Sequence, residues 1–412
     1  MSFRSVFIAL VLGFGLVLAG FLISRQRPAS DTSQSSAAMV LATGKCAECH
    51  TEQDYSIVHE YELSVHAAKG INCLDCHQPG QSQEPADHHG FVIAKNLTAA
   101  NCRSCHETEY QQFLRSRHAA PSWAAVYGEK GLTPEQVDFS EKFNPGACKR
   151  PANALATLEG PSAIASGCAK CHAVGKPNAD GTIGACTGCH TRHTSSVEIA
   201  RLPTTCGQCH MGPDHSQLEI YNESKHGVMF AAQKGQLKLG VAPKKLTSRD
   251  MFIPTCATCH MSGLNGQKVT HDPGERLSYL LAAEISTKRP GYALAQANMK
   301  ETCVQCHTRP IVERIYDEAE KAVANTNEKV KAAKEIYESL RTEKVISGPP
   351  FSYPVDFLYF DLWHYYGRTA KHGAFMGGQD FAQWHGNYPI LEHTVELKAQ
   401  AEELRRSHAK SK

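Results

Sequence analysis

The chain has 412 residues, with 43 basic and 41 acidic side chains and a formal net charge of +2. This near balance predicts no nucleic-acid partner, because such partners are bound by strongly basic surfaces. Aromatic residues make up only 8 % of the chain, whereas 17 cysteines are unusually many for this length. A chain of this size normally buries a large side-chain core. If the cysteines attach large apolar groups, these groups fill part of the interior, and regular structure between their sites is sparse.

The N-terminus carries a long uncharged run at residues 6–23. The run exceeds a usual signal-peptide core and approaches membrane-spanning length. No small-residue cleavage site follows directly. Arg25 and Arg27 weaken the difference in positive charge between the two ends of the run that would set its orientation in the membrane. We expect residues 1–24 to be an uncleaved anchor in the bacterial inner membrane, with a cleaved signal segment as the alternative. Either interpretation places the remainder in the periplasm. Residues 25–44 are a polar linker rich in Ser and Gln.

Sixteen of the cysteines form eight copies of Cys-x-x-Cys-His within residues 45–310. This pattern attaches c-type haem, because two thiols bond one edge of the macrocycle and the next residue places an imidazole on the iron. A zinc framework does not require histidine directly after every cysteine pair. We predict eight covalent haem c groups. The attachment residues are Cys46, Cys49, Cys73, Cys76, Cys102, Cys105, Cys168, Cys171, Cys186, Cys189, Cys206, Cys209, Cys256, Cys259, Cys303 and Cys306. The proximal ligands are His50, His77, His106, His172, His190, His210, His260 and His307.

The spacing of the motifs is uneven. The fourth, fifth and sixth motifs begin 18 and 20 residues apart, which predicts closely spaced haems. The longer gaps at residues 107–167 and 211–255 leave room for loops that shape a pocket. Cys148 stands outside every motif, and we favour a structural or incidental thiol over a reactive one.

Residues 311–412 contain no cysteine and form a separate helical domain in our interpretation. Neither Gly nor Pro interrupts residues 311–347, and the apolar residues recur at helical spacing. One long amphipathic helix is expected there, which packs on the haem domain or pairs with copies of itself. Residues 356–373 and 390–410 read as two further helices. The expected fold class is mainly α, a multihaem cytochrome c with long connections and a C-terminal helical bundle.

Fourteen histidines lie outside the motifs, and several share a local pattern. Ser-x-His followed by a small residue occurs around His66, His118 and His226, and Ala-Lys-His-Gly around His372 is close to it. We expect the small residue to let the backbone approach a haem face. If every iron has two histidine ligands, the protein only carries electrons, whereas one open iron makes it a redox enzyme. Histidine counting alone allows both.

Three stretches resemble the octahaem hydroxylamine oxidoreductase family. They are residues 168–227, the stretch KVTHDPGERLSYLLA after the seventh motif, and AKHGAFMGGQDFAQWHG near the C-terminus. The resemblance covers most of residues 45–390, with all eight motifs in order. It implies a mostly α-helical fold, a haem-rich N-terminal part and a C-terminal bundle that builds a homotrimer.

The resemblance also implies a set of site residues. The active haem, open on its distal side, is the one at Cys168, Cys171 and His172. Asp214 and His215 line the open side as a catalytic pair, since an imidazole titrates near neutrality and a neighbouring carboxylate can tune or relay its proton. The distal ligands implied for the other seven haems are His66, His88, His118, His193, His226, His271 and His372. His88 and the adjacent His89 are the assignment left open.

One departure from the family bears on whether the protein oxidises or reduces its substrate. Oxidative members carry a tyrosine that bonds the active haem of a neighbouring subunit, and Phe381 stands where we align it, with Tyr388 nearby. Members without the crosslink are associated with reduction. The favoured function is therefore reduction of nitrite and/or hydroxylamine to ammonium, supplied by a membrane quinol-linked or soluble cytochrome c partner. Hydroxylamine or hydrazine oxidation is the alternative, and a non-catalytic electron conduit is the third interpretation.

Overall fold

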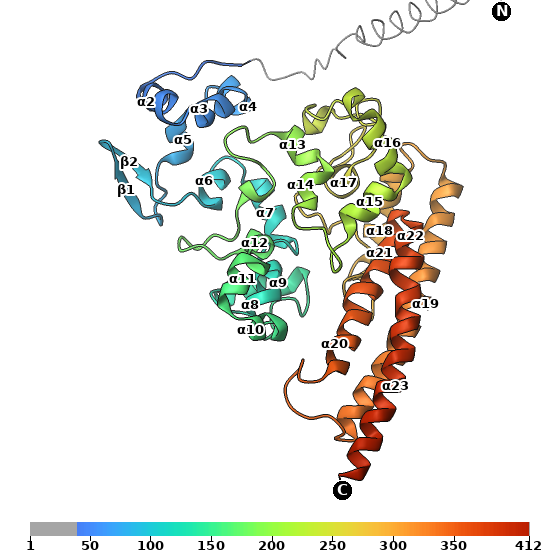
Figure 1. Cartoon of the computed structure of the whole chain (residues 1–412). Helices are drawn as coiled ribbons and strands as arrows, with labels where there is room; N and C mark the ends of the chain where they lie inside the picture. Colours follow the sequence, from blue (N-terminus) through green and yellow to red (C-terminus); the bar gives the residue numbers. More distant parts are fainter. Residues whose placement is uncertain (1–38, 412) are drawn as a thin grey trace, which may run out of the picture.

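A computed structural model describes residues 39–411. Short helices fill the haem-motif part, and long helices form an arm that ends near the C-terminus (Figure 1). The expected mainly α fold is confirmed. The segment 1–24 and most of the linker lie outside the described residues, so the anchor stays a prediction. Within residues 39–411, no helix has the length and apolar character needed to cross a membrane.

The haem-motif part is built from short elements. Its helices are α2 (Lys45–Gln53), α3 (Tyr55–Glu62), α4 (Val65–Ala68), α5 (Cys73–His77), α6 (Ala99–Arg103), α7 (Glu107–Arg115), α8 (Ala120–Tyr127), α9 (Pro134–Phe143), α10 (Ala154–Glu159), α11 (Pro161–Ser166), α12 (Cys168–His172), α13 (Val197–Arg201), α14 (Pro203–Gly207), α15 (Gln217–Glu223), α16 (Lys225–Gln233), α17 (Cys256–His260) and α18 (Tyr292–Cys303). Strands β1 (Pro85–His88) and β2 (Phe91–Ala94) form one antiparallel hairpin.

Each attachment motif is folded as a single tight turn. The backbone N–H of the histidine donates to the carbonyl of the first cysteine at His106, His190, His210 and His307, over 2.9–3.0 Å. This bond spans four residues, as in an α-helix, so the first cysteine and the histidine lie on one side of the turn. The local fold therefore presents a thiol and an imidazole together.

The long gap at residues 107–167 holds five helices, α7 to α11, where we expected loops. Capped helix starts explain the difference, since Thr133 begins α9 with a reciprocal capping box and Pro134 occupies the first helical position. Cys148 is fully buried in an apolar cluster with Val137 and Ile183. Its thiol donates to Ser140 Oγ over 3.2 Å, and burial raises its pKa. Both features support the structural interpretation of this cysteine.

The C-terminal arm contains the long helices. They are α19 (Arg309–Thr342), α20 (Pro354–Asp361), α21 (Arg368–Met376), α22 (Gln379–Ala382) and α23 (Tyr388–Lys410), with π-helical turns at Leu362–Gly367 (η5) and Gln383–Asn387 (η6). Helix α19 ends five residues before the expected residue 347, because Lys344 adopts a positive φ of 57° that a helix cannot continue. The expected helix 356–373 is interrupted by η5.

The apolar face of α19 packs within its own chain. Val330 and Leu340 are fully buried in a cluster with Ile390 and Leu397 of α23. The two helices run side by side along the arm (Figure 1). The stripe therefore packs against α21 and α23 of the same C-terminal arm, whereas we expected it to pack on the haem domain or to pair with a copy.

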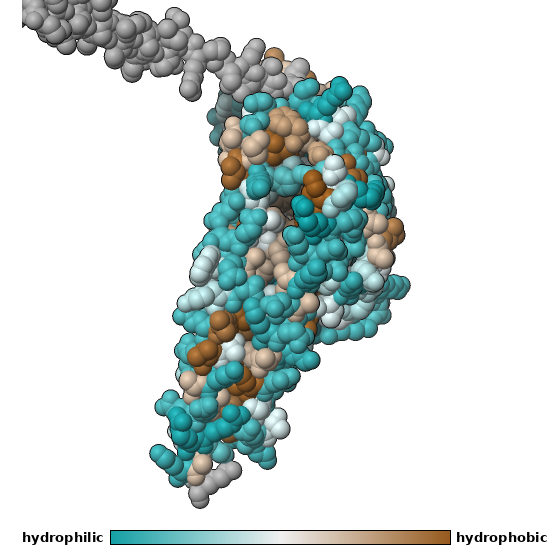
Figure 2. All heavy atoms as spheres, turned by 90° about the vertical axis from the view of Figure 1, so that its right-hand side faces the viewer, coloured by the Kyte–Doolittle hydropathy of each residue, from teal (hydrophilic) through white to brown (hydrophobic). Residues whose placement is uncertain are grey.

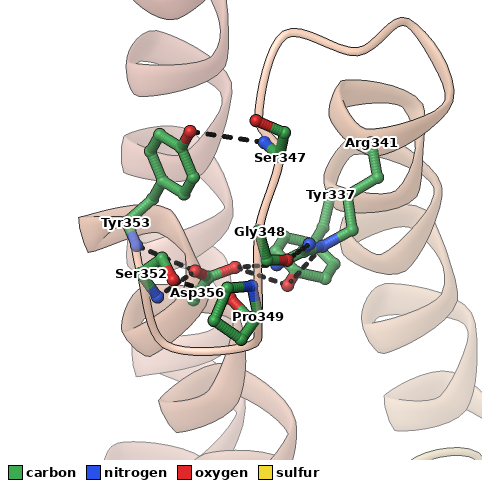
Figure 3. Close-up of polar contacts among 8 residues, drawn as sticks. All are labelled: Tyr337, Arg341, Ser347, Gly348, Pro349, Ser352, Tyr353 and Asp356. Atoms are coloured by element: carbon green, nitrogen blue, oxygen red, sulfur yellow. Dashed lines mark hydrogen bonds and ion pairs between the residues drawn. The ribbon is translucent and has the colours of Figure 1, made fainter.

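A buried carboxylate fixes the connection between α19 and α20 (Figure 3). The side chain of Asp356 is 2 % exposed and accepts hydrogen bonds from Arg341 at 2.7 Å and Tyr337 at 2.5 Å. The backbone N–H groups of Ser352 and Tyr353 also donate to it, each over 2.8 Å. Removing one partner of such a buried pair typically costs about 3–5 kcal/mol. The network holds α20, and the turn η5 that follows it, against α19.

Candidate functional site

Six motif histidines face a second histidine from elsewhere in the chain. The distances between ring centroids range from 5.7 to 6.4 Å. The pairs are His50 with His88, His106 with His66, His77 with His193, His210 with His118, His190 with His271, and His307 with His226. Every second member is one of the distal ligands implied by the resemblance.

These separations fit an iron between the two rings. An imidazole nitrogen binds a metal at about 2.0 Å, so two opposed rings have centroids roughly 6 Å apart. Ligation also requires neutral imidazoles. Burial lowers the pKa of each of the following ring groups: His66, His77, His118, His172, His190, His210, His226, His260, His271 and His372. The residues present therefore fit haem with two histidine ligands at six motifs.

The choice between two adjacent histidines is resolved by geometry. His88 ends β1, and its ring stacks towards His50 with an interplanar angle of 16°. His89 has a positive φ of 54° in the hairpin turn and meets His88 edge to face at 4.8 Å. The structure thus places His88, and not His89, opposite the first motif.

The repeated Ser-x-His-small pattern also serves the chain's own fold at two of its sites. Ser64 and Ser224 are helix N-caps whose hydroxyls accept the N–H three residues on, which puts His66 and His226 in the first turn. A Cβ on Gly227 would lie 1.9 Å from the Tyr221 carbonyl oxygen. At Gly227 the small residue is therefore required by the chain's own packing, and the expectation that it also lets the backbone approach a haem face stays a prediction.

His260 and His372 share another feature. Within the described part of the chain they form no facing pair like the six above. His260 Nδ1 lies 3.2 Å from the Pro273 carbonyl oxygen, and His372 Nδ1 lies 2.8 Å from that of Arg368. A hydrogen bond at Nδ1 fixes the ring and leaves Nε2 free, which is the usual support for a ligating histidine.

His172 of the fourth motif is oriented in the same way. Its Nδ1 lies 2.7 Å from the carbonyl oxygen of Ser122, in α8. No second histidine faces it at the ring separation of the six pairs among residues 39–411. Ser122 comes from the long gap before the motif, and the sequence pattern gave no signal for this supporting role.

The predicted catalytic pair lies near this histidine and against that of the sixth motif, since the ring of His215 meets that of His210 edge to face at 6.1 Å. Asp214 Oδ2 and His215 Nδ1 are 2.7 Å apart, with both side chains about one-third exposed, and their charges act on His172. Burial acts to raise the pKa of the Asp214 carboxyl, but the hydrogen bond to His215 and nearby positive charge hold it below its usual value. The carboxylate therefore stays ionised at neutral pH.

The fourth and sixth motifs meet at this point. The Sγ atom of Cys171 lies 3.8 Å from the carbonyl oxygen of Gln208, and it also contacts Cys209. Asp214 and His215 follow the sixth motif after three residues, so the contact between the two motifs brings the pair close to the fourth motif. Thiols of other motifs also touch, Cys102 with Cys186 and Cys206 with Cys256.

The two aromatic residues considered for the crosslink have different surroundings. Phe381 is buried in α22, and its ring lies 4.8 Å from that of His385. Tyr388 begins α23, and 47 % of its surface is exposed. Of the two, Tyr388 is the side chain that a neighbouring molecule could reach.

Comparisons with known proteins agree with this geometry. The family model described as "Seven times multi-haem cytochrome CxxCH" matches residues 69–354, which hold seven of the eight motifs. A "Probable nitrite reductase-hydroxylamine oxidoreductase fusion protein" of Kuenenia stuttgartiensis is 25 % identical over 413 residues, covering 84 % of this chain and 43 % of that protein. The chain thus spans less than half the length of that curated relative.

Two solved structures share the fold. A "Hypothetical multiheme protein" superposes with a TM-score of 0.77 at 19 % identity, covering 93 % of this chain and all of that one. A reducing HAO-like protein complex of Kuenenia stuttgartiensis gives 0.66 at 20 % identity, covering 89 % and 86 %. Together with the motif turns and the facing histidines, the family match identifies the protein as a c-type cytochrome with covalently bound haem: the chain belongs to the multihaem CxxCH cytochrome family.

Proposed function

We propose that the protein reduces nitrite and/or hydroxylamine to ammonium at an open haem held by Cys168, Cys171 and His172. The observation that carries this proposal is the Asp214–His215 pair near His172, a motif histidine that no second histidine faces in the described chain. Haem supplies the electrons and the binding position for the substrate nitrogen. The names of the curated relative and of the reducing HAO-like complex support this substrate class.

The chain's own residues have defined parts in this proposal. Ser122 holds the His172 ring so that Nε2 points away from the hydrogen bond. His215 delivers protons to the reduced nitrogen compound, and Asp214 orients the imidazole and stabilises its charged form. Reduction to ammonium consumes protons together with electrons, so a proton donor at this place is chemically required.

The other seven haems form the electron supply. We assign their distal ligands to His66, His88, His118, His193, His226, His271 and His372. The contacts between cysteines of neighbouring motifs support short distances between the haems that these motifs would hold, and the contact between Cys171 and Cys209 supports a sixth haem next to the open one. Electrons then enter from a membrane quinol-linked or soluble cytochrome c partner outside the cytoplasm.

The functional unit is a homotrimer in this proposal, although the surface that supports it differs from the helix first expected. Helix α23 and the preceding η6 present an exposed apolar stripe at spacings of four, three and four residues, made of Trp384, Tyr388, Leu391 and Val395. Figure 2 shows hydrophobic surface interrupted by polar side chains along the helical arm. A second copy would cover this stripe.

One observation favours oxidation as a second candidate. Tyr388 lies within the exposed stripe, where a neighbouring copy would pack. If Tyr388 made the bond to a neighbour's haem, the protein would instead oxidise hydroxylamine or hydrazine.

An anaerobic assay tests the proposed direction. Protein supplied with a reduced viologen dye and nitrite, or hydroxylamine, should oxidise the dye and release ammonium. Boiled protein and a His215→Ala variant serve as controls. Absence of ammonium with either substrate, accompanied by hydroxylamine oxidation with an electron acceptor, would contradict reduction.

A further inference from the structure

A further histidine, His364, lies near the Asp214–His215 pair, and both members of the pair act on its pKa. It belongs to η5, the π-helical turn that leads into α21. Two hydroxyl contacts tie the start of α21 to the loop that carries the catalytic pair. Ser216 Oγ and Thr369 Oγ1 are 3.2 Å apart, and Thr369 Oγ1 donates to the Pro213 carbonyl over 3.4 Å. The loop 213–216 is therefore fixed against this helical segment.

A π-helical turn precedes the residue that contacts this loop. Bonds in a π-helix join residues five apart, whereas those of an α-helix join residues four apart. His364 lies inside this wider turn, which covers Leu362–Gly367. Arg368, Asp214 and His215 act on the pKa of His364, and Asp214 also acts on that of the adjacent Tyr365. Both aromatic side chains of the turn therefore lie near the loop that carries the catalytic pair.

The imidazole of His364 is packed against aromatic rings, but one of its nitrogens lacks a hydrogen-bond partner. It stacks on Phe360 with centroids 4.2 Å apart and an interplanar angle of 19°, and Trp363 meets it edge on at 5.0 Å. Its Nδ1 is buried without a hydrogen-bond partner in the described chain. Burial lowers the pKa of His364 to about 3, so the ring is neutral at physiological pH. A neutral imidazole offers one N–H donor and one acceptor nitrogen.

Arg368 adds positive charge on the same side. Its guanidinium lies over the Trp363 ring at 5.2 Å, and its Nε donates to the Ala282 carbonyl over 2.8 Å. Burial lowers the pKa of Arg368 only to about 10, so it remains charged at neutral pH. A fixed cation beside a neutral donor suits a small anion better than a neutral amine.

We propose that His364 is a substrate-binding residue of the open-haem site, which donates a hydrogen bond to bound nitrite. The anion lies between His364 and the Asp214–His215 pair, and Arg368 contributes long-range attraction. The inference rests on the proposed function, because it requires an open iron at the fourth motif. It adds to that function a preferred ligand: this side of the site binds an anionic nitrogen oxide.

The test uses oxidised, fully haem-loaded protein without any electron donor, so that no turnover occurs. Nitrite is titrated while the optical and electron paramagnetic resonance signals of the high-spin haem are followed. His364→Phe keeps a ring on Phe360 but removes both nitrogens, and it should raise the dissociation constant about ten- to a hundredfold, as expected for a lost hydrogen bond to a charged group. His364→Asn keeps a hydrogen-bond donor, so its dissociation constant for nitrite should rise clearly less.

His393→Phe is the matched control. His393 also has a buried Nδ1 without a partner in the described chain, and its ring meets Tyr366 edge to face at 4.7 Å. It is not among the groups that act on Asp214, so nitrite binding should be unchanged. If His364→Phe fails to hold its haems, His364→Leu takes its place in the same titration.

The outcomes separate the two proposals. Wild-type protein with no high-spin haem would overturn the proposed function and this inference together. Wild-type protein with a high-spin haem, but with the same nitrite affinity in His364→Phe, would overturn only the inference. An Asn variant as weak as the Phe variant would also overturn it, because ring shape and not hydrogen bonding would then set the affinity.

Discussion

Asp214 Oδ2 lies 2.7 Å from Nδ1 of His215, shortly after the sixth motif and near the histidine of the fourth. The carboxylate can orient the imidazole and stabilise its protonated form. We expect His215→Ala to lower turnover of nitrite and hydroxylamine about 10²-fold or more, the usual scale for a lost acid–base group. Haem content and the low-spin optical bands should not change.

The chain offers a matched control for this variant. His385 Nε2 pairs with Asp380 Oδ2 over 3.0 Å, and both side chains are largely exposed on the C-terminal arm. His385→Ala should leave turnover within about twofold of the wild type, since exposed pairs contribute little. Equal losses in the two variants, or none in His215→Ala, would remove the Asp214–His215 pair from the mechanism.

The number of haems can be counted directly. The family match begins at residue 69, so the first motif at Cys46 and Cys49 lies outside the matched region, although His50 and His88 face each other there. Intact-protein mass spectrometry should show eight haem additions. A Cys46→Ala/Cys49→Ala double variant should show seven. Seven additions in fully matured wild-type protein would disprove the octahaem assignment.

Local chemistry explains how much of this architecture could be read from the sequence. The attachment motifs can be recognised because covalent bonding to haem fixes both the residue types and their spacing. Four of the second histidines stand in the Ser-x-His-small pattern or close to it, and the full set came from the resemblance, since residues such as His193 and His77 are far apart in the chain and no local pattern joins them. Ser122 and His364 were missed because a backbone carbonyl has no sequence signature, and a π-helical turn changes which residues share a face.

Helix α19 shows the limit of periodicity. Its apolar stripe was correctly recognised, but the pattern could not tell an intramolecular partner from a copy of the chain. The structure fills that stripe with α21 and α23 and leaves a different one exposed. The end of the helix was misplaced because the left-handed conformation of Lys344 is set by the connection that follows.

The exposed stripe of α23 makes a prediction about assembly. A Leu391→Glu/Val395→Glu double variant places charge on residues that are 61 % and 62 % exposed, so the fold of one chain should survive. Light scattering of protein freed of residues 1–24 should change from a trimer to a monomer at micromolar concentration. Leu294→Glu, at another exposed apolar position on α18, is the control. A wild-type monomer would contradict the proposal.

The crosslink can be decided by peptide mapping. With Phe381 buried and lacking a phenol oxygen, we expect no C-terminal peptide joined to the haem peptide that contains Cys168 and Cys171. The reduced optical spectrum should also lack an extra red-shifted band. A peptide containing Tyr388 bonded to that haem peptide would instead support the oxidative function.

The central claim is that one haem of eight, at His172, is open while seven have two histidine ligands. Electron paramagnetic resonance of the fully oxidised protein, with spin quantitation, tests it most directly. The account predicts one high-spin ferric haem and seven low-spin haems per chain, with the high-spin signal altered by added nitrite. Eight low-spin haems that do not respond to nitrite would contradict the account and leave the protein an electron carrier.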